Sequence, residues 1–76
     1  MLSNKLLNLL IKKKITFFSG VPDSVLSDFI KVIEKKRDLK HIISSNEGTA
    51  VSTAIGHYLA TKTIPCVYLQ NSGLGN

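Results

Sequence analysis

Apolar residues recur every three or four positions in three segments of the chain, and this spacing predicts three amphipathic helices. The segments are residues 3–13, residues 23–34 and residues 47–61. Ser3 is the expected N-cap of the first helix, and Asp23 or Ser24 that of the second, because such side chains accept hydrogen bonds from free backbone amides. Each helix would turn its apolar side towards a common core.

Short continuous apolar runs lie between and after the helical segments, at residues 15–18, 41–44 and 65–69. Runs of this length that contain β-branched and aromatic residues are typical of buried strands. Strands that alternate with helices predict βαβ units and a parallel sheet. The expected fold class is α/β, a three-layer arrangement of a parallel sheet with flanking helices.

Each predicted strand is followed by a cluster of small and polar residues. The clusters are Ser19-Gly20-Val21-Pro22-Asp23-Ser24, Ser44-Ser45-Asn46-Glu47-Gly48 and Gln70-Asn71-Ser72-Gly73-Leu74-Gly75-Asn76. In a parallel α/β sheet, ligands bind beyond the carboxyl ends of the strands. We therefore expect the three clusters to contribute to one binding site.

Small residues crowd the first half of the third predicted helix, where Gly48, Ala50, Ala54 and Gly56 occur. Glycine in a helix interior lowers the stability of the helix. This composition is explained if the helix approaches another backbone closely.

The third predicted strand has no helix after it within the 76 residues. A parallel strand is normally covered on both faces. We therefore expect residues 1–76 to be the N-terminal part of one domain that is incomplete here.

The net charge of +5 is concentrated in two basic clusters, Lys12-Lys13-Lys14 and Lys35-Lys36-Arg37. Each cluster falls where a helix should end, and cations there complement the helix dipole. Both clusters would lie at the amino ends of the strands, opposite the expected ligand edge. This placement favours solvated helix ends over nucleic-acid binding.

Other side chains add little chemistry. No apolar run approaches the ~20 residues that a membrane span needs, and the single Cys66 cannot build a disulfide framework. His41 and His57 show no metal-binding spacing with Cys66 or with each other. The sequence thus predicts a cytoplasmic protein with no membrane segment and no metal ligands of its own.

The motifs from Phe17 to Asn76 resemble the pyrimidine-binding domain of thiamine-diphosphate enzymes, in particular phosphonopyruvate and sulfopyruvate decarboxylases. The three clusters carry the resemblance, each after its own strand, whereas residues 1–14 match only loosely. Pyruvate decarboxylases resemble the first cluster with an added glycine before the aspartate, which this chain lacks. The resemblance implies the thiamine-diphosphate-binding fold, truncated here to its first three strands.

The resemblance implies a catalytic role for Glu47. In the family, a glutamate at this position hydrogen-bonds a ring nitrogen of the cofactor's aminopyrimidine and lets the cofactor act as its own base. The alternative is that Glu47 is only a favourable acid in the first turn of a helix. The flanking motifs favour the catalytic interpretation.

The first and third clusters receive implied roles as well. Val21, Pro22, Asp23 and Ser24 would line the substrate pocket, with Asp23 positioning a proton or a water molecule. Gln70, Asn71, Ser72 and Gly73 would contact the cofactor. The alternatives are that Asp23 and Ser24 only cap a helix and that residues 70–73 only close a strand.

The family also implies Mg²⁺ and a diphosphate-binding domain with a Gly-Asp-Gly motif, which this sequence lacks. A homo-oligomer or a partner subunit would supply that domain, so we expect residues 1–76 alone to be inactive. The leading expectation is decarboxylation of phosphonopyruvate, a small 2-oxo acid, with sulfopyruvate as the alternative substrate. From a different class, a non-catalytic nucleotide- or phosphate-binding α/β module stays open because Gly73-Leu74-Gly75 resembles the start of a phosphate loop.

Overall fold

The computed structural model describes residues 2–24 and 26–69 and contains three helices and three strands in that part of the chain. In chain order they are α1 (Leu2–Lys12), β1 (Phe17–Gly20), α2 (Ser27–Glu34), β2 (Lys40–Ile43), α3 (Glu47–Thr61) and β3 (Cys66–Tyr68). None of the described helices is long and apolar enough to cross a membrane.

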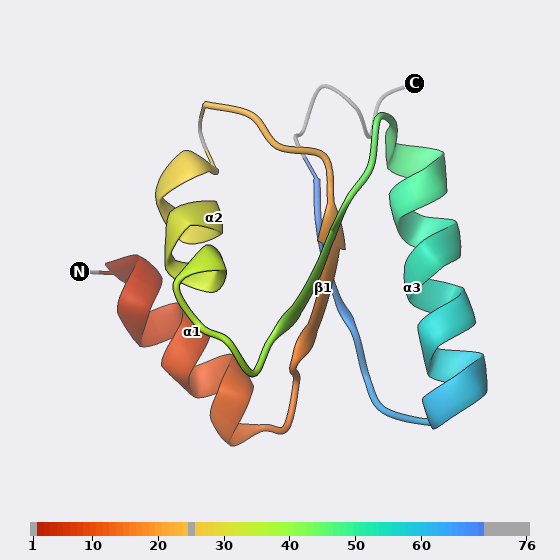
Figure 1. Cartoon of the computed structure of the whole chain (residues 1–76), viewed down its shortest axis with the longest axis horizontal. Coiled ribbons are helices and arrows are strands. Elements are labelled where there is room, and N and C mark those ends of the chain that lie inside the picture. Colours follow the sequence, from red (N-terminus) through yellow and green to blue (C-terminus); the bar gives the residue numbers. More distant parts are fainter. Residues whose placement is uncertain (1, 25, 70–76) are drawn as a thin grey trace.

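The strands form one parallel sheet in the order β2-β1-β3. Phe18 of β1 pairs with His41 of β2 on one side and with Cys66 of β3 on the other. Helices α1 and α2 cover one face of the sheet and α3 lies alone on the other (Figure 1). The predicted three-layer α/β fold is confirmed.

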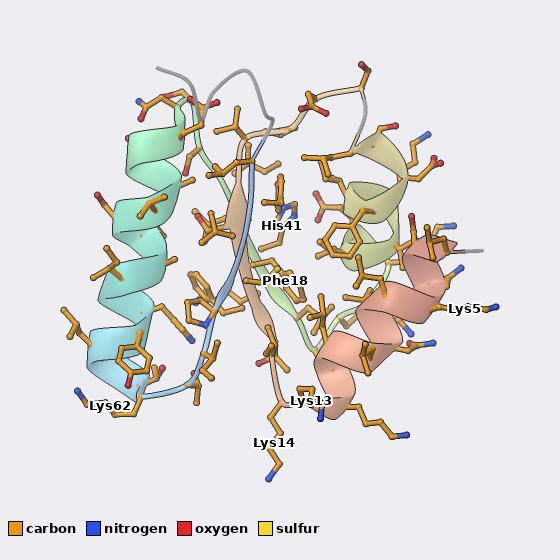
Figure 2. The ribbon with its side chains drawn as sticks, turned by 180° about the vertical axis from the view of Figure 1, so that it is seen from behind. Lys5, Lys13, Lys14, Phe18, His41 and Lys62 are labelled. Carbon is orange, nitrogen blue, oxygen red and sulfur yellow. The ribbon has the colours of Figure 1, made fainter. Side chains whose placement is uncertain are left out.

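The main core lies between the sheet and the helix pair α1–α2. Leu7, Phe18, Phe29 and Ile33 form a buried cluster, and the rings of Phe18 and Phe29 meet edge to face with centroids 6.2 Å apart. Burying a side chain of this size contributes about 1.5–3 kcal/mol. Figure 2 shows Phe18 between the sheet and these helices, while Lys13 and Lys14 extend from the amino end of β1 into solvent. The first basic cluster, Lys12-Lys13-Lys14, therefore lies at the amino end of the strands, as the sequence predicts.

Small side chains let α3 pack directly on the other face of the sheet. Ala50 and Ala54 are buried, and the hydroxyl of the fully buried Ser19 donates a hydrogen bond of 2.9 Å to the carbonyl of Ala50. The rings of Phe17 and His57 stack with centroids 3.9 Å apart. Close approach to another backbone is thus confirmed for the two alanines, and His57 has a packing role.

Three predicted boundaries are wrong by a few residues. β1 begins at Phe17 instead of residue 15, because Lys14 adopts a left-handed conformation (φ 65°) and the amides of Lys14 and Ile15 bond back to α1. α2 begins at Ser27 instead of residue 23 or 24. Ser3 is not an N-cap, because it lies inside α1.

Candidate functional site

The loops that follow β1 and β2 leave the sheet at one edge. The last residues of the strands, Gly20, Ile43 and Tyr68, are register partners in the parallel sheet, so their carboxyl ends lie together. Asp23 follows β1 and Glu47 follows β2 at this edge, shown at the top of Figure 1. The proposed cofactor contacts Gln70, Asn71, Ser72 and Gly73 lie outside the described residues.

Glu47 is the first residue of α3 and its side chain is half-buried. Asn46 caps the helix from an extended conformation, and its side-chain oxygen accepts a hydrogen bond of 2.8 Å from the amide of Thr49. This cap was missed by the sequence analysis, although Asn is among the best N-cap residues. It fixes the start of α3 and with it the position of the Glu47 side chain.

Asp23 has the capping role that the sequence predicts, but it caps a turn that precedes α2. One carboxylate oxygen accepts a hydrogen bond of 2.9 Å from the amide of Leu26, while the other is buried and has no partner among the described residues. Within the same turn the hydroxyl of Ser27 donates to the carbonyl of Ser24. Val21 is half-buried, whereas Pro22 and Ser24 are exposed. The segment thus holds one carboxylate oxygen with capacity for a further hydrogen bond.

Ser19 links the two parts of this edge. Its buried hydrogen bond to Ala50 joins β1, which precedes Asp23, to the first turns of α3, which carry Glu47. The signal in the sequence was a small polar residue at the end of an apolar run. Its role could not be predicted from one sequence, because its partner lies 31 positions away.

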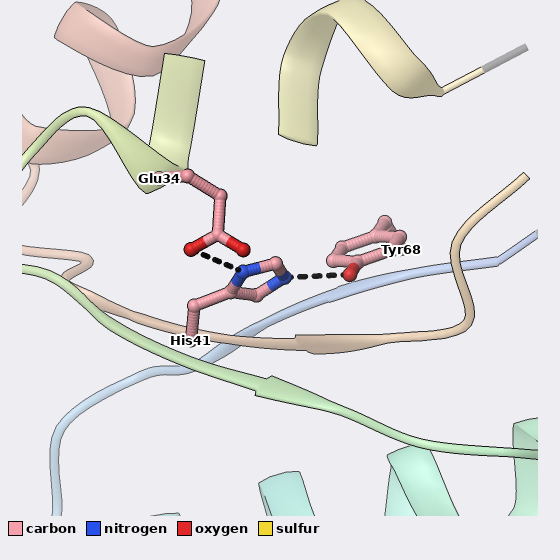
Figure 3. A network of polar contacts seen from close by, with 3 residues as sticks. All are labelled: Glu34, His41 and Tyr68. Carbon is pink, nitrogen blue, oxygen red and sulfur yellow. Dashed lines mark hydrogen bonds and ion pairs between the residues drawn. The ribbon is translucent and has the colours of Figure 1, made fainter. Parts of the chain in front are cut away.

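A second polar network lies on the face of the sheet opposite α3. The sequence did not predict it. Nε2 of His41 lies 2.6 Å from the hydroxyl of Tyr68, and Nδ1 lies 3.5 Å from a carboxylate oxygen of Glu34, an ion-pair distance rather than a hydrogen bond (Figure 3). Burial raises the pKa of Tyr68 to about 12, with smaller contributions from the charges of Glu34 and Cys66. Burial also raises the pKa of the Cys66 thiol.

The ring of Tyr68 occupies the space beside Gly20, where a Cβ atom would collide with it. A glycine at this place therefore lets the tyrosine ring cross β1 and reach His41 on β2. The network holds all three strands together directly below the candidate site.

The side chains at this edge can be compared with the hydrogen-bond acceptors and metal ligands that a thiamine cofactor needs. The half-buried Glu47 can accept a hydrogen bond from an aminopyrimidine, whereas the unpartnered oxygen of Asp23 has acceptor capacity but is buried. Among residues 2–24 and 26–69, no group of three or more His, Cys, Asp or Glu side chains could hold a metal ion. This part of the chain thus suits the organic ring of the cofactor and offers no ligand set for the metal of a diphosphate.

An apolar cavity of about 400 Å³ lies between α1, α2 and β3. Its lining residues include Leu6, Leu10, Phe29 and Cys66, and it lies on the face of the sheet opposite α3. Leu26 and Tyr68 also line the cavity, so it reaches the end of β3 and the turn that Asp23 caps, whereas Glu47 belongs to α3 on the other face of the sheet.

Comparison with known proteins identifies the family to which this chain belongs. Residues 2–76 match the family model described as "Thiamine pyrophosphate enzyme, N-terminal TPP binding domain". Sulfopyruvate decarboxylase subunit alpha of Methanocaldococcus jannaschii is 35% identical over 69 residues, which cover 91% of this chain and 40% of the relative. The chain belongs to the thiamine pyrophosphate enzymes and matches their N-terminal cofactor-binding domain.

Proposed function

We propose that this chain forms the pyrimidine-binding half of a thiamine-diphosphate-dependent decarboxylase that acts on a small, anionic 2-oxo acid. One observation carries the proposal: the family match spans residues 2–76, and within it Glu47 occupies the capped start of α3 at the ligand edge of the sheet. When bound, thiamine diphosphate supplies the electron sink for the loss of CO₂.

Glu47 acts as the acid that holds the aminopyrimidine. Its carboxyl group hydrogen-bonds a ring nitrogen and shares a proton with it, which requires shielding from water. The half-buried position in the first turn of a capped helix supports this role, and a bound ring would complete the shielding.

Asp23 orients a proton or a water molecule beside the substrate, through the carboxylate oxygen that has no partner among the described residues. Asp23→Asn keeps one oxygen for the amide of Leu26, so the fold should tolerate it, while turnover should fall by about 10²-fold or more. Turnover and the urea midpoint are measured in the assembled enzyme. Asp28→Asn, an exposed acid in the first turn of α2, is the matched control. Wild-type turnover in Asp23→Asn would leave Asp23 with its capping role alone.

Sulfopyruvate is the favoured substrate, because the relative from Methanocaldococcus jannaschii is named for that activity. Phosphonopyruvate, the first expectation from the sequence, is the second candidate because both are 2-oxo acids with an anionic head group. The chain spans 40% of the relative, so the assembled full-length protein is required for the test. Release of CO₂ from each acid with thiamine diphosphate and Mg²⁺ should be greater for sulfopyruvate, whereas no release from either would refute the proposal.

A partner subunit or a further domain holds Mg²⁺ and the diphosphate. The relative is named as a subunit, and the described residues contain no cluster of metal-binding side chains. The active site would then form where that partner meets the edge that carries Asp23 and Glu47.

A further inference from the structure

Exposed basic side chains gather at the amino ends of the strands. Each helix ends there in a turn that leads into the next strand, and Figure 2 shows Lys13, Lys14 and Lys62 at this same end of the molecule. Two acids, Glu34 and Asp38, lie close to these turns in the sequence, so positive charge remains in large excess. We call the exposed cations of the three turns the amino-end surface, which consists of Lys12-Lys13-Lys14, Lys35-Lys36-Arg37 and Lys62.

The proposed cofactor edge cannot use this charge. Asp23 and Glu47 follow the carboxyl ends of β1 and β2, whereas the amino-end surface precedes the strands. A strand of four residues such as β1 is about 13 Å long, and salt screens exposed charges beyond a Debye length of about 8–10 Å. The cations are therefore too far away to attract an anionic substrate to that edge.

The folding of the helix ends does not explain all of these cations. Lys14 and Lys62 lie just past the ends of α1 and α3 in a left-handed backbone conformation, with φ angles of 65° and 61°. Glycine is the usual residue at such positions, because a side chain strains this conformation. Two lysines at positions that favour glycine indicate that their charge has a use other than folding.

No acid in the described part of the chain neutralises the amino-end surface. The single ion-pair contact among residues 2–24 and 26–69 joins His41 to Glu34 and includes no lysine or arginine. Lys62 has a cation–π contact, with its ammonium 5.6 Å from the centroid of the exposed Tyr58 ring. A solvated surface of one sign attracts molecules of the opposite sign, so the partner that fits is a polyanion.

The composition of the amino-end surface favours the phosphates of a nucleic acid duplex over an acidic protein. Six of its seven cations are lysines. Lysine is depleted in protein–protein interfaces, whereas it is a common phosphate ligand that acts as a point charge. Binding of single strands uses aromatic rings on which bases stack, and the ring of Tyr58 is already covered by Lys62.

We propose that the amino-end surface binds duplex nucleic acid through its phosphate backbone, without reading the base sequence. The two basic clusters alone are explained as solvated helix ends, but Lys62 and the left-handed lysines add a third turn and a strained backbone to them. The binding is independent of the proposed decarboxylase activity, because it uses the opposite end of the sheet.

The test is the fluorescence anisotropy of a labelled DNA duplex of about 20 base pairs and mixed sequence, titrated with the full-length protein at several salt concentrations. The double variant Lys14→Gly with Lys62→Gly removes two cations and relieves both left-handed positions. The double variant Lys5→Gln with Lys31→Gln is the matched control, because it removes the same charge from exposed sites within α1 and α2, outside the amino-end surface.

The wild type should bind with a dissociation constant of about 10⁻⁶–10⁻⁴ M, and the logarithm of its affinity should fall against that of the salt concentration with a slope of about −4 or steeper. The glycine double variant should bind about tenfold more weakly and lose about 2 from this slope, whereas the control should stay within about threefold of the wild type. Its thermal unfolding midpoint should be no lower than that of the wild type, since glycine relieves the strain. Turnover should be the same in all three proteins.

Four results would overturn the proposal. The first is no binding of the duplex at protein concentrations up to about 100 µM. The second is an equal loss of binding in both double variants. The third is binding of polyglutamate or of phosphatidylglycerol vesicles at least as tightly as the duplex, which would indicate an acidic protein or a membrane as the partner. The fourth is a fall in turnover in the glycine double variant alone, which would connect the surface to the active site.

Discussion

Tyr68 is the residue at which the three strands are joined by side-chain contacts. Its ring lies against Gly20 of β1, and its hydroxyl meets His41 of β2 at 2.6 Å. His41 is almost fully buried, so loss of the hydroxyl would leave its Nε2 atom without a partner. Buried polar groups without a partner cost about 1–3 kcal/mol.

The raised pKa of Tyr68 makes the stability of the fold depend on pH. The folded protein favours the neutral phenol up to about pH 12, whereas the unfolded chain loses this proton near pH 10. The contribution of Tyr68 to the free energy of unfolding is therefore complete below pH 10 and is lost as pH rises from 10 through 12. Urea unfolding at pH 8, 10, 11 and 12 measures this fall.

Two variants isolate the effect of Tyr68. Tyr68→Phe should be less stable than the wild type at pH 8 and should show a smaller fall above pH 10. Tyr58→Phe, at an exposed tyrosine on α3, should fall as the wild type does. Cys66 is present in all three proteins, so its own titration does not affect the comparison. Parallel loss of stability in the wild type and in Tyr68→Phe would contradict the role given to Tyr68.

Among the elements, α3 determines where the proposed catalytic acid lies. Its start is fixed by the Asn46 cap and its distance from the sheet by Ala50, Ala54 and the bond from Ser19. The cap is local, whereas the bond from Ser19 joins residues 31 positions apart. The position of Glu47 thus depends on both local and tertiary contacts.

Removal of the cap should loosen α3 at the end that carries Glu47. Asn46→Ala deletes the acceptor for the amide of Thr49 and should lower the free energy of unfolding by about 1 kcal/mol. Asn46→Asp keeps an acceptor and should stay close to the wild type. Urea unfolding followed by circular dichroism gives both values, and equal stability of Asn46→Ala and the wild type would show that the cap contributes nothing.

The sequence predicted α3 at its observed bounds from the helical spacing of its apolar residues, although the Asn46 cap that fixes its start was not recognised. It misplaced the start of β1, because Lys14 takes a left-handed conformation that usually signals glycine, and a lysine carries no such signal. The start of α2 was misplaced because Asp23 caps a turn, after which Leu26 is not yet helical. Local sequence patterns were thus sufficient to predict the helices and strands. The wrong start residues of β1 and α2 result from unusual backbone conformations at the ends of these elements.

At the scale of the whole molecule, the parallel sheet and its two helical layers followed from the alternation of strands and helices. The strand order β2-β1-β3 did not, nor did the contacts of His41 with Tyr68 and of Ser19 with Ala50, because these join segments that are distant in the sequence. The edge that carries Asp23 and Glu47 was predictable, since it needs only the direction of the strands. The roles of Gln70, Asn71, Ser72 and Gly73 stay predictions.

The family match supports the cofactor interpretation over the nucleotide-binding module, while the choice of substrate depends on the name of one relative. The chain covers 40% of that relative, and its described residues include the edge proposed to hold the aminopyrimidine but no ligand set for the diphosphate metal. Glu47 and the cofactor ring that it would hold are therefore central to the proposed chemistry.

Exchange of the C2 proton of thiamine diphosphate for deuterium, followed by NMR in the assembled full-length enzyme, tests this claim most directly. Glu47→Gln keeps the size of the side chain and removes its acid, so exchange should slow by about 10²-fold or more. Glu34→Gln, at the other glutamate of the chain and on the opposite face of the sheet, is the control and should exchange at the wild-type rate. Exchange in Glu47→Gln at a rate close to that of the wild type would contradict the proposed role of Glu47.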